Sequence, residues 1–313
     1  MRPATLVYLT LPPLMWASNA IVGRLAVAGT DPLISPLALN ALRWVVTLVI
    51  LAVVAALVAR RAAAGAGSGT ASGPAGEART SPWRIYAVFG LLSVAVYNAL
   101  QYVALQTSSA INVTLIAAGG PLFVLLIGRL FFGAHARRWA WIGACLSLVG
   151  VFVVLTGGDP ARLARLRIAG GDLLMVVATI VWALYSWLLR RRRPAVPVLT
   201  LLLLQTAWGV AFSMPVVAIE WLAGDVVLRP DFRTAAVVAW TALGPSLLAF
   251  WCWDRGVASA GPVMPTFFAN LTPLFAALMS AALLGEPPQG FHALAFLLTM
   301  GGIALSQRGA VPH

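Results

Sequence analysis

Ten long apolar stretches, each about as long as a bilayer is thick, run through this chain of 313 residues. A helix that crosses about 30 Å of hydrocarbon needs roughly 20 mostly apolar residues, because each residue adds about 1.5 Å. The chain is therefore predicted to span a membrane ten times. The predicted spans are residues 6–28, 34–59, 83–105, 110–132, 137–156, 170–190, 197–222, 234–257, 262–284 and 289–307.

The composition supports helical spans and excludes most other classes of protein. Hydrophobic residues make up 61% and charged residues 10% of the chain, too little charge to keep a soluble domain's surface in water. Strands of a membrane barrel would alternate with a period of two residues, and runs such as 44–58 do not. We predict an all-α membrane protein with the lipid bilayer as its surroundings.

The arginines predict the orientation of the chain in the membrane. With the N-terminus inside, 14 of the 21 arginines lie in cytoplasmic segments, including the run Arg190–Arg193, and 5 lie outside. This asymmetry is typical of the positive-inside rule and places both termini in the cytoplasm. The net charge of +12 is therefore attributed to topology, and no nucleic-acid partner is expected.

An internal repeat divides the chain into two halves of five spans. At an offset of 152 residues, Pro121-Leu-Phe123 matches Pro273-Leu-Phe275, and Gly150 matches Gly302. Because five is odd, the second half must enter the membrane in the opposite direction. We therefore predict two inverted repeats, residues 1–157 and 158–313, with a flexible cytoplasmic loop at about 60–82 that is rich in Ala, Gly and Ser. Secondary transporters with such repeats bind substrate near mid-membrane and work by alternating access.

The same residues carry a resemblance to a known family. Trp16-Ala-Ser-Asn19, Leu39-Asn-Ala-Leu-Arg43 and the duplicated Pro-Leu-Phe helix resemble the EamA-type transporters of the drug/metabolite transporter superfamily. The resemblance implies export of small metabolites, commonly amino acids, and is greatest to the YddG type of aromatic amino-acid exporter in the bacterial inner membrane. The first half departs from the family pattern, because Gly133-Ala134 stands where Gly-Glu is common, whereas Gly285-Glu286 keeps it.

Polar and aromatic side chains inside the predicted spans are the candidate substrate contacts, since polar groups at this depth are costly unless they are paired or functional. Uncharged amides and hydroxyls can bind both the carboxylate and the ammonium of an amino acid, and aromatic rings can pack its side chain. The candidates are Trp16, Asn19, Tyr97, Asn98, Gln101, Asn112, Trp182, Tyr185, Trp251 and Asn270.

Each candidate also has a structural interpretation. Aromatic residues can belong to the interfacial belt, and amides can simply join neighbouring helices. Arg43 is expected to pair or to reach the outer interface, with substrate-carboxylate binding as the alternative, and Asp254 is expected to pair with Arg255. Pro121 and Pro273 are predicted to bend their helices, as hinges or as packing kinks.

Other functions have weaker support in the sequence. A membrane enzyme would need clustered acids for a metal or a nucleophilic set, and the three histidines, His135, His292 and His313, lie far apart. A channel would be expected to show a filter repeat or a charged ring. We therefore expect a transporter that needs no metal or cofactor and that works as a monomer, with another metabolite class as the alternative substrate.

Overall fold

The computed structural model describes residues 2–27, 33–65, 82–108, 110–164, 169–224, 226–284 and 289–308. Within these ranges the chain is helical, apart from turns and one isolated antiparallel bridge between Ile34 and Leu228. Apolar helices of this length satisfy their own backbone hydrogen bonds, which lipid cannot do for them. The all-helical prediction is confirmed for the described residues.

The first half begins with two long helices and continues with two interrupted ones. Its elements are α1 (Pro3–Val27), α2 (Pro36–Gly65), α4 (Trp83–Gly90), the π-helix η1 (Leu91–Val96), α5 (Tyr97–Thr107), α6 (Ala110–Ala118), α7 (Gly120–Phe132) and α8 (Arg138–Thr156). A short helix, α9 (Ala161–Ala164), follows α8.

The second half repeats this order of elements. It consists of α10 (Gly170–Arg191), α11 (Val198–Leu222), α12 (Phe232–Thr241), the π-helix η2 (Ala242–Leu248), α13 (Ala249–Ala260), α14 (Val263–Ala269), α15 (Thr272–Leu284) and α16 (Gly290–Arg308). A π-helix therefore interrupts both the third and the eighth predicted span.

Seven of these helical segments are long and apolar enough to cross a membrane. The bent pair α6 and α7, with 45° between its two parts, makes an eighth if it is one span. Residues 263–279 form a shorter apolar segment. The helices begin and end within a few residues of the predicted spans, whereas the count of ten transmembrane helices stays a prediction.

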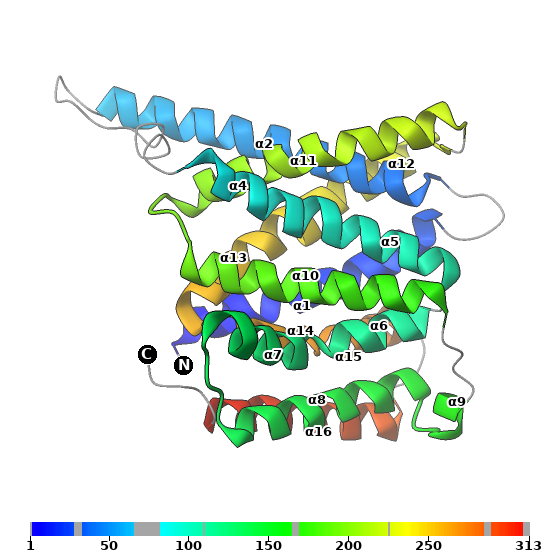
Figure 1. Cartoon of the computed structure of the whole chain (residues 1–313). Helices are drawn as coiled ribbons and strands as arrows, with labels where there is room; N and C mark the ends of the chain where they lie inside the picture. The colour runs from blue at the N-terminus through cyan, green and yellow to red at the C-terminus, as the bar shows by residue number, and fades with distance from the viewer. Residues whose placement is uncertain are drawn as a thin grey trace.

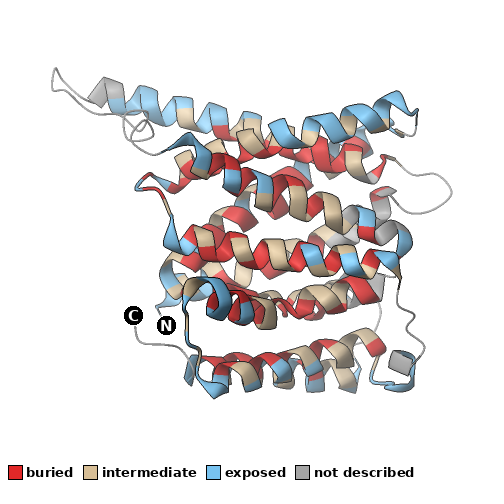
Figure 2. Ribbon diagram, viewed as in Figure 1, coloured by how far each residue is buried: buried red, intermediate tan, exposed pale blue. Residues whose placement is uncertain are grey.

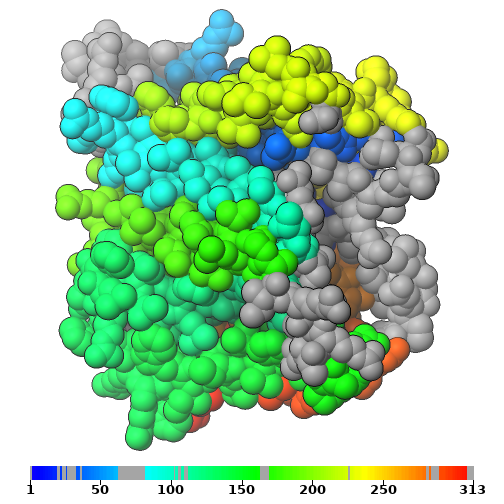
Figure 3. All heavy atoms as spheres, turned by 45° about the vertical axis from the view of Figure 1, so that its right-hand side comes forward, coloured from blue at the N-terminus to red at the C-terminus, as the bar shows by residue number. Residues whose placement is uncertain are grey.

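The helices run side by side in layers, from α2 and α11 to α8 and α16 (Figure 1). The start of α1 and the end of α16 lie at the same end of this bundle. The space-filling view shows the side chains of α11, α4, α10 and α8 packed in successive bands (Figure 3). Figure 2 shows exposed residues along the outer faces of helices such as α2. The exposed side chains of α2 include Val49, Val53 and Leu57, and such an apolar surface suits lipid.

One predicted boundary is wrong. The loop was expected to begin at about residue 60, but α2 continues to Gly65. The segment 60–65, with Arg60, Arg61 and three alanines, consists largely of good helix formers, so the helix extends beyond the apolar run. Residues 66–81 of the predicted loop, and Gly285-Glu286, lie outside the described residues.

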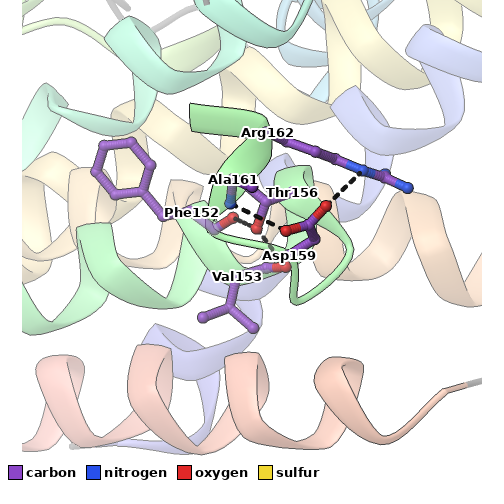
Figure 4. Close-up of polar contacts among 6 residues, drawn as sticks. All are labelled: Phe152, Val153, Thr156, Asp159, Ala161 and Arg162. Atoms are coloured by element: carbon purple, nitrogen blue, oxygen red, sulfur yellow. Dashed lines mark hydrogen bonds and ion pairs between the residues drawn. The ribbon is translucent and has the colours of Figure 1, made fainter. Parts of the chain in front are cut away.

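Polar caps fix the turns at the bundle end where α9 lies. After α8, Gly157 adopts a left-handed backbone, φ 64°, and ends the helix. Asp159 accepts a hydrogen bond from the Ala161 N–H at 2.9 Å and forms an ion pair with Arg162 at 3.9 Å (Figure 4). At the start of α12, the Thr234 N–H donates to Asp231 at 2.7 Å, and this bond lowers the pKa of the Asp231 carboxyl.

Candidate functional site

Aromatic rings from four predicted spans meet near the middle of the bundle. The ring centroid of Trp182 lies 4.7 Å from that of Tyr97 and 5.0 Å from that of Trp253. It also lies 5.9 Å from Trp16 and 5.7 Å from Phe250. Because these distances are typical of favourable ring pairs, the rings form one connected group. We call it the aromatic centre: Trp16, Tyr97, Trp182, Tyr185, Phe250 and Trp253.

The position of each ring along its helix places the aromatic centre at mid-depth. Trp182 lies 12 residues into the 22-residue α10, and Trp16 lies near the middle of α1. The Trp16 indole N–H donates to the Pro245 carbonyl at 3.3 Å, inside η2. Helices α1 and α5 belong to the first half, and α10 and α13 to the second. The aromatic centre is therefore built jointly by the two halves of the chain.

A buried arginine network adjoins the aromatic centre. Arg43 donates to the side-chain oxygens of Asn40 at 3.1 Å and of Asn98 at 2.6 Å. The Asn98 amide nitrogen donates in turn to the carbonyls of Ser93 and Val94, both at 3.0 Å. These carbonyls belong to η1, where the wider π-helical turn interrupts the regular α-helical hydrogen bonding. The network thus fixes the Asn98 amide with its oxygen toward Arg43.

A second polar contact involves Tyr185, a member of the aromatic centre. The Tyr185 hydroxyl donates to the Asp254 carboxylate at 2.9 Å, and both residues are fully buried. Within the described residues, the second carboxylate oxygen of Asp254 has no hydrogen-bond partner. The expected pair of Asp254 with Arg255 is wrong. Neighbouring residues point about 100° apart on a helix, and Arg255 is exposed, with its guanidinium 5.1 Å from the Trp251 ring centroid.

Three of the predicted contacts lie away from the aromatic centre. Asn112 donates to the Asp172 carboxylate at 3.0 and 3.1 Å, tying α6 to the start of α10. Asn270 donates to the Ser147 hydroxyl at 2.9 Å and so joins the α14–α15 break to α8. Trp251 packs edge-on against Tyr8 of α1, with 5.6 Å between centroids.

The remaining predicted residues have simpler surroundings. Asn19 on α1 and Gln101 on α5 are half-buried. Pro121 is buried and lies two residues after the break at Gly119 between α6 and α7. Pro273 is buried at the start of α15, after the equivalent break at Asn270-Leu271. The two prolines therefore stand at matching interruptions, and their hinge role stays a prediction.

Sequence reasoning missed two members of the aromatic centre, Phe250 and Trp253. These residues are three apart, so they share one face of α13, while Trp251 is turned away from it. That spacing was a usable signal in the sequence, because Phe250, Trp251 and Trp253 form an aromatic-rich run. The pairing of Arg43 with the amides of Asn40 and Asn98 had no local sequence signal, because it depends on which helix faces which.

Comparison with known proteins assigns the family. The model of the EamA-like transporter family matches residues 4–156 and residues 169–307. The chain belongs to the EamA-like transporter family. It is therefore a multi-pass membrane transporter, and the two matched segments correspond to the two halves described above.

Relatives of this transporter occur in bacteria and archaea. It is 26% identical over 221 residues to "Uncharacterized transporter YyaM" of Bacillus subtilis, covering 70% of this chain and 71% of the relative. It is 26% identical over 221 residues to "Uncharacterized inner membrane transporter YedA" of Escherichia coli K12, covering 64% and 63%. A solved crystal structure superimposes with a TM-score of 0.71 over 97% of this chain and 96% of the other, at 22% identity, and so shares the fold.

Proposed function

We propose that this transporter exports small metabolites across the bacterial inner membrane, with aromatic and other apolar amino acids as substrates. The observation that carries the proposal is the aromatic centre around Trp182, which lies at mid-depth between the two halves and beside uncharged amides. Rings can pack an apolar side chain and attract an ammonium group. This proposal narrows the substrates from the small metabolites of the family to the aromatic amino acids of the YddG type.

We further propose that the two halves are inverted five-helix repeats, so that the chain has ten transmembrane helices. Three matching features support this: π-helices in η1 and η2, helix breaks between α6 and α7 and between α14 and α15, and prolines Pro121 and Pro273 after those breaks. Inverted repeats give two near-equivalent packings, which is the basis of alternating access. The positive-inside pattern supports cytoplasmic termini, and a single chain supplies both halves of the proposed site, as a working monomer requires.

Flux measurements in liposomes test the proposal. Purified protein is reconstituted, and uptake of labelled phenylalanine, tryptophan, methionine and a sugar is followed with and without a proton gradient. We expect saturable amino-acid flux and no sugar flux. The Trp182→Ala variant should lower the flux at least about tenfold, because it removes the ring that contacts all five other rings of the aromatic centre.

Trp221→Ala is the matched control, since Trp221 is 61% exposed at the end of α11 and should leave the flux unchanged. Equal flux in the two variants would contradict the assigned site. Folded protein that transports none of the amino acids would contradict the substrate class and direct the search to other metabolites. Flux that does not respond to the gradient would identify a facilitator.

A further inference from the structure

Arg43 is a cation held inside the protein. Its side chain is 5% exposed, about 10 Å along α2 from the first residue of that helix. Its two hydrogen bonds go to the neutral amides of Asn40 and Asn98. Among the described residues, no carboxylate forms an ion pair with it. The buried carboxylate of Asp254 instead accepts from Tyr185.

This arrangement leaves hydrogen-bonding capacity on the guanidinium. Arginine carries five N–H donors in a planar fork that fits a carboxylate with two parallel bonds. Two of the donors are used, and the described part of the chain offers no hydrogen-bond acceptor to the other three. A buried cation is costly unless it is paired, so an arriving anion gains more here than at an exposed arginine.

Arg43 is also joined to the aromatic centre through its neighbours in the sequence. The Arg43 guanidinium lies 5.3 Å from the ring centroid of Trp44, and this ring packs against Phe250 with 4.9 Å between centroids. Tyr97 directly precedes Asn98, the partner of Arg43, and lies on Trp182. The cationic group and the rings therefore border one another, as the two ends of a small amphipathic ligand require.

We propose that Arg43 binds the carboxylate of the transported molecule, while the aromatic centre packs its apolar part. The substrate class is then a monocarboxylate with a planar or apolar side group, and decarboxylated amines are excluded. Asn98 is a positioning residue: its side-chain oxygen holds the Arg43 guanidinium until the substrate carboxylate replaces that oxygen. This inference rests on the proposed function and names Arg43 as the group that makes transport selective for carboxylates.

Competition against phenylalanine flux tests which end of the substrate is recognised. The competitors are 3-phenylpropionate, which keeps the carboxylate and lacks the ammonium group, and phenethylamine, which keeps the ammonium group and lacks the carboxylate. In the wild type, we expect 3-phenylpropionate to inhibit at least about tenfold more strongly than phenethylamine. Equal inhibition by the two compounds would overturn the proposal.

Two variants test whether Arg43 binds the substrate carboxylate, and one of them leaves Arg43 in place. Asn98→Asp places a fixed carboxylate where the amide oxygen lies 2.6 Å from Arg43, so it should compete with the substrate and raise the KM for phenylalanine at least about tenfold. Arg43→Gln should abolish the preference between the two competitors. Arg190→Gln is the control, because Arg190 is exposed and bonds only the Ala258 carbonyl. Folded Asn98→Asp protein with an unchanged KM would overturn the proposal.

The failure of the proposed function can be told apart from failure of the Arg43 site. If folded wild-type protein carries no phenylalanine, the proposed function fails. The site is then judged from thermal unfolding in detergent. 3-Phenylpropionate should raise the unfolding temperature of the wild type and not that of Arg43→Gln, because only a ligand of the folded state stabilises it. An equal shift, or no shift in either protein, would overturn the proposed anion site.

Discussion

The contact face between α8 and α16 and the aromatic centre are both buried, but they are held together in different ways. In the pair, backbone meets backbone: a side-chain carbon added at Gly302 would lie 2.5 Å from the Gly143 carbonyl oxygen. In the aromatic centre, rings from four spans meet edge-on or tilted at 4.7 to 5.9 Å. Such a backbone contact allows one register, whereas rings can exchange partners by small rotations.

This difference separates a fixed scaffold from a part that can rearrange. We expect the α8–α16 pair to move as one body during transport. If one helix slid along the other, its Cβ atoms would collide with the backbone of its partner helix. The aromatic centre joins helices of both halves, so a change in their angle alters its contacts first. The following variants test this division, beginning with the largest expected effect.

Gly302→Ala should destabilise the scaffold by about 3 kcal/mol, because the new methyl group meets the backbone of α8, which cannot turn aside. Thermal unfolding followed by circular dichroism in detergent measures the effect. Gly301→Ala is the matched control: its added carbon meets only the end of the flexible Leu146 side chain, at 3.4 Å. Equal stability of the two variants would contradict the backbone contact.

Tyr185→Phe should destabilise the fold by about 2 kcal/mol, because it removes the donor to a buried carboxylate whose other oxygen already lacks a partner. The same unfolding measurement applies. Tyr86→Phe is the control, since the buried Tyr86 hydroxyl has no hydrogen-bond partner among the described residues. If the Tyr86 variant loses as much stability as the Tyr185 variant, removal of a buried hydroxyl, and not loss of the hydrogen bond to Asp254, explains the effect.

Ser147→Ala should have the smallest effect, about 1 kcal/mol. Ser147 lies on α8 and accepts the hydrogen bond of Asn270 at 2.9 Å, so it connects the scaffold to the break between α14 and α15. Ser213→Ala serves as the control, because the Ser213 hydroxyl donates to the Gly209 carbonyl of its own helix. Unchanged unfolding but altered phenylalanine flux in the Ser147 variant would show that this contact governs motion rather than stability.

Much of the site was visible in the sequence as residue types, and little of it as contacts. Trp16, Tyr97 and Trp182 were predicted as substrate contacts, and the structure brings their rings together. Asn112 and Asn270 were predicted in the same way, yet their amides join helices. An amide that binds substrate and one that ties two helices look alike in the sequence, because the helix facing it decides the role.

The sequence by itself determined where the helices run and that the chain is duplicated. A span must be apolar for its full length in lipid, and this requirement is visible residue by residue. The tertiary structure decided how each helix is turned about its axis. Helices that are apolar on nearly every side carry no amphipathic pattern to fix that rotation. The packing of neighbours therefore determined that Trp253 faces inward, that Trp251 does not, and that Arg43 is bound by the amides of Asn40 and Asn98.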